Sequence, residues 1–182
     1  MLRTLVALAK VDGRVCAYLE PIALYMTKDL YAPADGQWQF TYPPLDQTMT
    51  LGEERVYSAE AKDLVIFTFG NGVPMSLRAA REIEAKHGWK VRVVDLRWLA
   101  PLNDAAIGRH AGECKRILVV DEGRKSAGVG EGVITAVVEA GHGAKPLRRV
   151  VGVDTFTPLA GAALLVLPGD ADIVSAADKL AK

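Results

Sequence analysis

The segment Arg116–Gly132 combines the residue types that could best support chemistry: an apolar run, an acidic pair and a glycine-spaced turn. Gly128, Gly130 and Gly132 open an apolar helix. Helix-terminal amides attract anions, and glycine lets a ligand approach the backbone, so this turn could hold a phosphate. The spacing departs from the GxGxxG dinucleotide fingerprint, however, and no acidic residue follows at the ribose position. We therefore favour a turn that packs the helix against a sheet.

The acidic pair Asp121 and Glu122 could supply a general acid and a general base. Adjacent residues on an extended strand point to opposite faces, so the two carboxylates cannot converge on one substrate atom. Carboxylates at strand ends often cap loops instead. We expect loop capping, with an interface role for Glu122 as the functional alternative.

The histidines and cysteines show no catalytic or metal-binding spacing. His87, His110 and His142 lie near glycines at predicted helix ends, where an imidazolium complements the helix dipole. Cys16 and Cys114 are far apart, which favours buried free thiols in a reducing cytoplasm. Because no Ser, Cys or Lys has a nucleophile context, we expect no catalytic, cofactor-binding or metal-binding residues on this chain.

Composition limits the function classes further. The 182 residues are 50% hydrophobic, carry no net charge and can bury a full core. Basic residues are interspersed with acidic ones, so we expect no nucleic-acid partner. The start of the chain lacks a signal-peptide pattern, and no run reaches the length of a membrane span. We expect a cytoplasmic protein without a membrane partner.

The first fifty residues do not form a complete unit by themselves. Leu2, Leu5, Val6 and Ala9 share one helical face, and Val15–Leu19 is predicted to be a short strand. Because one helix and one strand cannot bury both faces of a sheet, residues 1–30 are interpreted as the end of a larger domain. Residues 31–52, rich in Pro, Gly and aromatic residues, are predicted to form an ordered linker.

Residues 53–182 show regular alternation of strands and helices. Strands are predicted at 55–59, 64–69, 91–96, 117–120 and 147–153. Near-continuous apolar strands are typical of a parallel sheet covered on both faces. We expect a three-layer α/β/α domain with a five-stranded, mostly parallel sheet and one antiparallel edge strand. Right-handed crossovers would place loops 70–74, 97–103 and 122–130 on one rim.

Several blocks of this region resemble a known family. They are LVIFTFGNGVPMSLRAA, KVRVVDLRWLAPLN, RILVVDEGRKSAGVGEGV and VVGVDTFTPLA. In this order and spacing they resemble the transketolase carboxy-terminal domain, as found in the beta subunit of thiamine-diphosphate-dependent 2-oxo acid dehydrogenases. The resemblance covers about Glu53 to Lys182. The leading segment, with GRVCAYLEPIALY, resembles the end of the preceding pyrimidine-binding domain of that subunit.

The resemblance implies a scaffold and interface role in oxidative decarboxylation with acyl transfer to lipoyl. Thiamine diphosphate and magnesium would belong to the complete enzyme, and none is expected on this chain alone. Asp35-Gly36 lacks the family's magnesium-binding asparagine pattern, and the activating glutamate would lie upstream of Met1. Implied partners are a second copy in a homodimer, the cofactor-binding domains or alpha subunit, and the lipoyl acyltransferase core.

The positions that could contribute to such interfaces are acidic or follow the fourth strand. They are Asp121, Glu122, Gly123, Asp170, Asp172 and Asp178. Two other functions stay open at this point. One is a stand-alone regulatory module that binds an anion at Gly128–Gly132. The other is part of another transketolase-like enzyme, with Arg124 and Lys125 as candidate ligands for a sugar phosphate.

Overall fold

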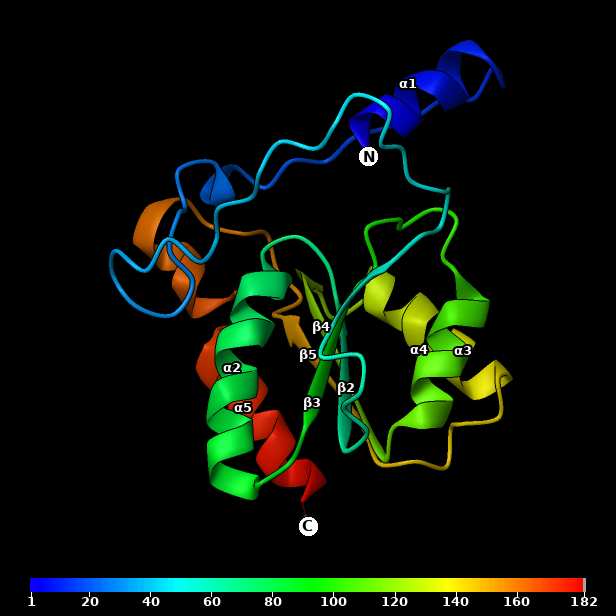
Figure 1. The fold of residues 1–182 in the computed structure, drawn as a ribbon. Helices are drawn as coiled ribbons and strands as arrows, with labels where there is room; N and C mark the ends of the chain where they lie inside the picture. The colour runs from blue at the N-terminus through cyan, green and yellow to red at the C-terminus, as the bar shows by residue number, and fades with distance from the viewer. Residues whose placement is uncertain (182) are drawn as a thin grey trace.

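A five-stranded sheet with helices on both faces forms the centre of the computed structural model, which describes residues 1–181 (Figure 1). The strands are β1 (Arg55–Tyr57), β2 (Leu64–Thr68), β3 (Val91–Asp95), β4 (Arg116–Arg124) and β5 (Leu147–Gly152), in the order β1-β3-β2-β4-β5. Only β1 runs antiparallel to its neighbour. The predicted fold class, including the antiparallel edge strand, is confirmed.

Four helices cover the sheet, two on each face (Figure 1). One face carries α2 (Gly72–His87) and α5 (Asp170–Leu180), and the other carries α3 (Asp104–Glu113) and α4 (Val129–Glu139). β2 lies in the middle and all five of its residues are buried. Burial on both faces explains why its sequence is a continuous apolar run without alternation.

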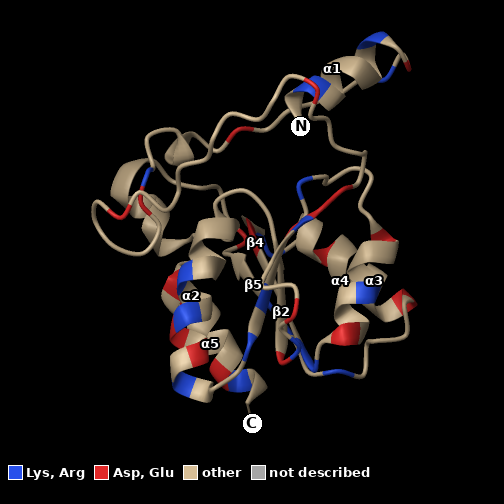
Figure 2. Ribbon diagram, viewed as in Figure 1, with Lys and Arg blue, Asp and Glu red and all other residues tan. Residues whose placement is uncertain are grey.

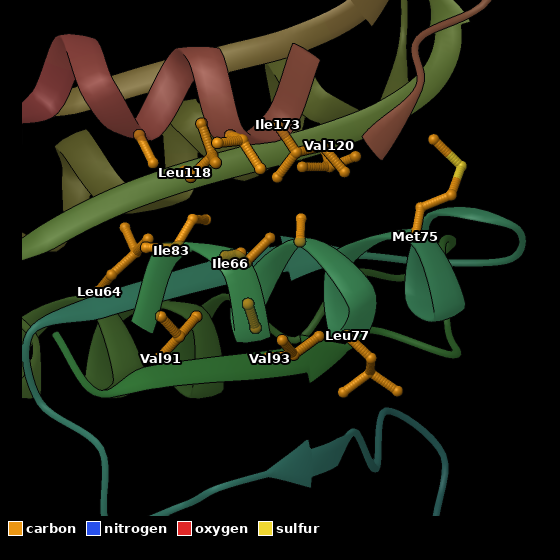
Figure 3. Close-up of a cluster of buried hydrophobic side chains, with 14 of the residues drawn as sticks. Leu64, Ile66, Met75, Leu77, Ile83, Val91, Val93, Leu118, Val120 and Ile173 are labelled. Atoms are coloured by element: carbon orange, nitrogen blue, oxygen red, sulfur yellow. The ribbon is translucent and has the colours of Figure 1, made fainter. Parts of the chain in front are cut away.

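The core is divided by the sheet into two clusters. Figure 3 shows the cluster beneath α2 and α5, where Ile83 and Ile173 meet strand residues such as Ile66 and Leu118. The second cluster lies beneath α3 and α4 and includes Phe67. Successive residues of β2 therefore enter opposite clusters, as expected from the two-residue period of a strand.

Helix boundaries follow local signals. Asn103 caps α3, because its side chain accepts a hydrogen bond from the amide of Ala106 at 3.0 Å. Gly169 is the capping residue of α5, and its amide donates to the Asp172 side chain at 2.8 Å. Asp170 is the first helical residue.

The amino-terminal segment contains α1 (Leu2–Lys10) and the 3-10 helix η1 (Ile22–Leu24), and α1 buries none of its residues. The predicted strand at Val15–Leu19 is wrong, because these residues form no strand pairing and Val15 and Leu19 are exposed. A strand needs a neighbour for its backbone groups. Nothing else in residues 1–181 supplies one here. The proposed boundaries at 30 and 52 stay a prediction.

The linker region is held by its own polar groups. Asp29 accepts hydrogen bonds from the amides of Ala34 and Gly36, and Asp35 accepts four from the amides between Leu30 and Gln37. Trp38 packs against the core cluster beneath α2 and α5. Backbone amides that are satisfied by side chains give this loop a defined shape without secondary structure.

One segment, Ala160–Leu180, is long and apolar enough to cross a membrane by length and composition, contrary to our expectation that no run reaches that length. The structure divides it into the 3-10 helix η2 (Ala160–Leu165) and α5. Ile173 and Ala177 of α5 are fully buried in the core.

Acidic and basic residues are interspersed along α2 and α5 (Figure 2).

Candidate functional site

The carboxyl ends of β2, β3 and β4 meet at one rim of the sheet. The loop after β2 leads to α2 on one face, whereas β4 leads to α4 on the opposite face (Figure 1). β2 and β4 are neighbours, so the chain reverses its direction of winding between them. Open α/β sheets bind ligands in the crevice that such a switch point creates.

A cavity of about 840 Å³ lies at this rim. Its floor includes Asn71 after β2, Asp95 and residues 97–101 at the end of β3 and beyond, and Glu122 in β4. The amino-terminal segment, together with Trp38 and Phe40, forms its other wall. Two of the three predicted rim loops therefore meet at the cavity, with Glu122 from the third.

Glu122 and Asn71 form the polar centre of the floor. The Asn71 Nδ2 donates to Glu122 Oε2 at 2.8 Å. Burial raises the pKa of Glu122, the neighbouring Asp121 adds to the rise, and the hydrogen bond from Asn71 opposes it. The Oδ1 atom of Asn71 is buried and has no hydrogen-bond partner among residues 1–181.

Asp121 has a different role from its neighbour. Its side chain is buried, and it accepts hydrogen bonds from the amide of Gly123 at 2.7 Å and from the amide of Gly130 at 2.8 Å. Asp121 thus faces α4, whereas Glu122 faces Asn71 at the start of α2 on the other side of the sheet. The prediction that the two carboxylates cannot converge is confirmed.

The glycine-spaced turn is filled from within the chain. A Cβ atom on Gly128 would lie 2.7 Å from Asp121 Oδ2, and one on Gly130 would lie 3.2 Å from the same oxygen. The first turn of α4 therefore already faces a carboxylate, which takes the place that an external phosphate would need. This arrangement confirms the packing turn that we favoured and disfavours the anion-binding alternative.

Charged and aromatic residues also line the cavity. Arg55 lies 4.9 Å from the ring centroids of both Phe40 and Tyr57, in a cation–π arrangement. Burial raises the pKa of Asp95, while Arg97 and its backbone amide act in the opposite direction. Asp95 and Arg97 form an ion pair at 3.8 Å.

Trp98 is another residue that lines the cavity. Its side chain is only 6% exposed, and its indole Nε1 has no hydrogen-bond partner among the described residues. A buried indole N–H normally finds an acceptor. Trp98 and Asn71 both line the cavity, and each holds one buried polar atom without a partner among residues 1–181, a donor in Trp98 and an acceptor in Asn71.

The three histidines are structural, but they do not all carry the predicted charge. His87 pairs with Asp178 at 2.8 Å in the last turn of α2, and His142 follows α4. His110 is buried, and its Nδ1 accepts a hydrogen bond from Arg92 while its Nε2 lies 3.2 Å from Glu54. Burial lowers the pKa of His110, the hydrogen bond to Glu54 opposes the fall, and Arg109 and Arg92 add to it. Because a guanidinium can only donate, Nδ1 of His110 is an acceptor, which differs from the predicted imidazolium.

The remaining candidate interface residues make contacts within the chain. Asp170 accepts two hydrogen bonds from Arg78, at 2.5 and 3.0 Å. Asp178 pairs with Lys86 as well as His87. Together with Asp172, which accepts from the amide of the capping residue Gly169, they fix α5 to α2 or stabilise its start. Gly123 lies exposed next to Glu122.

The described residues hold no cluster of metal ligands, and one free cysteine, Cys16, lines the rim cavity. Within residues 1–181 no three His, Cys, Asp or Glu side chains are grouped so that they could hold a metal ion. Cys114 is buried, and burial raises the pKa of its thiol. Cys16 is only half-buried, contrary to the prediction of two buried thiols.

Comparison with known proteins decides the family. Residues 53–169 match the family described as "Transketolase, C-terminal domain". The chain belongs to this family. Its relatives include the pyruvate dehydrogenase E1 component subunit beta of Staphylococcus aureus strain Mu50, which is 32% identical over 162 residues. The alignment covers 88% of this chain and 46% of the relative. The Bacillus subtilis subunit is 34% identical over 145 residues, which covers 76% of this chain and 42% of the relative.

Solved structures agree with this family assignment. A split gene transketolase, described as an inactive beta4 tetramer, has a TM-score of 0.63 at 28% identity and covers 75% of this chain and 44% of that chain. The 2-oxoglutarate:ferredoxin oxidoreductase from Magnetococcus marinus, at 18% identity and a TM-score of 0.50, shares the fold; the alignment covers 71% of this chain and 20% of that chain. The present chain spans about half the length of the curated relatives that it matches.

Sequence reasoning found Glu122 but missed its surroundings. An acidic residue at a strand end indicated Glu122, whereas Asn71 was only one position of the predicted rim loop 70–74. Trp98 and Arg55 gave no signal, because an aromatic residue or an arginine near a strand usually serves packing or solubility. Their shared cavity in the transketolase C-terminal domain depends on strand order, which the sequence pattern does not specify.

Proposed function

We propose that the chain is the carboxy-terminal scaffold and interface part of a thiamine-diphosphate-dependent 2-oxo acid dehydrogenase component. The carrying observation is its likeness to pyruvate dehydrogenase E1 beta subunits, which extends over most of this chain. The complete enzyme would decarboxylate a 2-oxo acid oxidatively and pass the acyl group to lipoyl, in the cytoplasm. The cofactor would supply the carbanion chemistry, and this chain would supply support.

The described residues do not fit thiamine diphosphate with magnesium. A magnesium diphosphate needs oxygen ligands that converge on the metal, and residues 1–181 contain no such acidic group. The helix start that could hold a diphosphate faces the Asp121 carboxylate instead. We therefore assign the cofactor to the other part of the complete enzyme and derive no reaction step on this chain.

Exposed apolar residues of the amino-terminal segment support the interface role. Leu2 and Val6 of α1 are 58% and 47% exposed, and Ile22 of η1 is 80% exposed. Large apolar side chains that are exposed to water favour contact with a partner, so these residues are candidate interface positions. The implied partners are a second copy of the chain, the cofactor-binding domains or alpha subunit, and a lipoyl acyltransferase core.

The six positions proposed for these interfaces differ in whether their side chains already make contacts within the chain. Asp121, Asp170, Asp172 and Asp178 are used by contacts within the chain. Glu122 and Gly123, at the rim, are the positions that we propose for contact with a partner. The four aspartates would contribute only through their outward-facing atoms.

A chimera tests the proposed function. The whole chain replaces the corresponding carboxy-terminal part of the Bacillus subtilis E1 beta subunit, and the product is purified with its alpha subunit. We expect pyruvate decarboxylation in the presence of thiamine diphosphate and magnesium, measured with an artificial electron acceptor. A chimera that assembles with the alpha subunit but has no activity would contradict the proposal.

Calorimetry of the isolated chain gives a second test. Titration with thiamine diphosphate and magnesium should give no stoichiometric binding, since the ligands are absent from the described residues. Tight binding, or turnover of any 2-oxo acid by the chain alone, would overturn the assignment of the catalytic centre to another part of the enzyme.

The likeness to a split gene transketolase favours a ketol transferase as the second candidate. A sugar-phosphate substrate would need basic side chains at the rim. Arg124 and Lys125 are exposed and do not line the rim cavity, so they do not provide that site. A transketolase assay of the same purified complex, with a sugar phosphate as the donor, separates the two reactions.

A further inference from the structure

The rim cavity contains unsatisfied hydrogen-bonding groups whose chemistry points to one kind of ligand. Asn71 is the residue before α2, a position where an asparagine side chain usually accepts a hydrogen bond from the helix amides. Here the side chain makes no capping bond and reaches Glu122 instead. Its Oδ1 is left buried without a donor. Such an atom costs free energy unless a ligand satisfies it.

Glu122 needs a donor for the same reason. Asn71 bonds only Oε2 of the carboxylate, and no hydrogen bond to Oε1 is present within residues 1–181. Burial raises the pKa of Glu122, and the negative charge of the neighbouring Asp121 raises it further. Arg14, Arg55 and Arg97 line the same cavity, but Arg97 pairs with Asp95 and Arg55 lies over the rings of Phe40 and Tyr57. Glu122 forms no ion pair within residues 1–181, so a cationic donor at its free oxygen would be favoured.

The arrangement of acceptors selects the shape of that cation. Oδ1 of Asn71 and Oε1 of Glu122 belong to two side chains that are already joined by a 2.8 Å hydrogen bond. A guanidinium carries several N–H groups in one plane and can donate to both acceptors at once, whereas an ammonium is a point charge. Phe69 and Trp98 line the same cavity and suit the flat face of a guanidinium.

We propose that the rim cavity binds an arginine side chain of a partner polypeptide, with Glu122 and Asn71 as the guanidinium acceptors. The indole Nε1 of Trp98, which is buried and unpartnered, donates to a backbone carbonyl of the same polypeptide segment. The site lies at the switch point between β2 and β4, where open α/β sheets bind ligands. It stands on this geometry and not on the reaction proposed above.

The test uses the full chain, labelled with ¹⁵N, and small probes that imitate the proposed segment. Nα-acetyl-arginine amide carries both a guanidinium and carbonyl groups, and Nα-acetyl-citrulline amide is its uncharged counterpart. We expect saturable shifts of the Trp98 indole resonance with the arginine probe, and at least tenfold weaker binding of the citrulline probe. Equal binding of both probes, or no saturable binding, overturns the proposal without the use of any variant.

Variants then assign the contacts. Glu122→Gln and Asn71→Ala should each weaken binding of the arginine probe about tenfold. The matched control is Glu82→Gln, which removes an exposed carboxylate on α2 away from the cavity and should bind like the wild type. Wild-type affinity in Glu122→Gln would refute the role of Glu122.

Agmatine separates the two halves of the site. It has a guanidinium but no carbonyl, so Trp98→Phe should weaken binding of the arginine probe several-fold and leave agmatine binding unchanged. The Trp98→Phe variant lacks the indole resonance, so binding to it is followed by the backbone amide resonances around Gly70 and Gly123. An equal loss for both probes would contradict the donor role of Trp98.

Discussion

Replacing Asp121 by alanine should destabilise the domain far more than removing an exposed helix cap. The Asp121 carboxylate accepts from the amides of Gly123 and Gly130, at 2.7 and 2.8 Å. The side chain is 2% exposed, and the Gly130 amide is buried with it. Alanine removes both acceptors and leaves Glu131 as the remaining negative charge at the first turn of α4.

The magnitude follows from the burial of each amide. A buried amide that loses its partner costs about 1–3 kcal/mol, and this applies to Gly130. Gly123 is exposed, so water replaces much of the lost bond, and the cost is about 0.5 kcal/mol, the low end for a cap. We expect Asp121→Ala to lower the free energy of unfolding by about 2–3 kcal/mol.

Urea denaturation followed by circular dichroism measures this change. The matched control is Asp172→Ala, whose carboxylate is exposed and accepts one amide hydrogen bond at the start of α5. It should cost about 0.5–1 kcal/mol. The denaturant slope should stay the same in both variants, since neither changes the surface exposed on unfolding. Equal losses in the two variants would refute the reasoning about burial.

Three further perturbations test other parts of the fold. Because burial lowers the pKa of His110, the unfolded chain takes up the proton first, so the free energy of unfolding should fall between pH 7.5 and 5.5. Urea titrations should show this fall in the wild type and not in His110→Gln. A double-mutant cycle on Arg78 and Asp170, a half-exposed pair, should give a coupling of about 0.5–1 kcal/mol by the same method. Gly72→Ala would place a Cβ 2.0 Å from the Thr68 hydroxyl and should lower the melting temperature, with a cost of about 1–3 kcal/mol; an unchanged melting temperature would contradict the close contact.

The sheet could be predicted from the sequence because its strands are apolar on both faces. Leu64–Thr68 is buried at every position, so its continuous apolar sequence correctly indicated a strand buried on both faces. The same reasoning failed for Val15–Leu19, which has a strand-like sequence but no neighbouring strand in residues 1–181. Local pattern describes what a segment can form, and pairing depends on what lies beside it.

The site was less predictable because it depends on contacts between distant residues. Asn71 and Glu122 are 51 positions apart, and they meet only because β2 and β4 are neighbours in the sheet. The alternation of side chains along a strand was enough to separate Asp121 from Glu122. It did not identify the residue that each would contact, since that requires the strand order and the helix positions.

The separation of these two adjacent carboxylates has a consequence for variants of the rim. Asp121 and Glu122 differ by one position on β4, yet one faces α4 and the other faces the cavity beside α2. Asp121→Asn should therefore lower the free energy of unfolding while the folded fraction still binds the arginine probe. Glu122→Gln should weaken binding of the probe about tenfold while the free energy of unfolding is retained. Urea denaturation and the probe titration, carried out on both proteins, measure the two effects independently. If Glu122→Gln lost as much stability as Asp121→Asn, Glu122 would be a structural residue of the domain, and the cavity would lose its proposed acceptor.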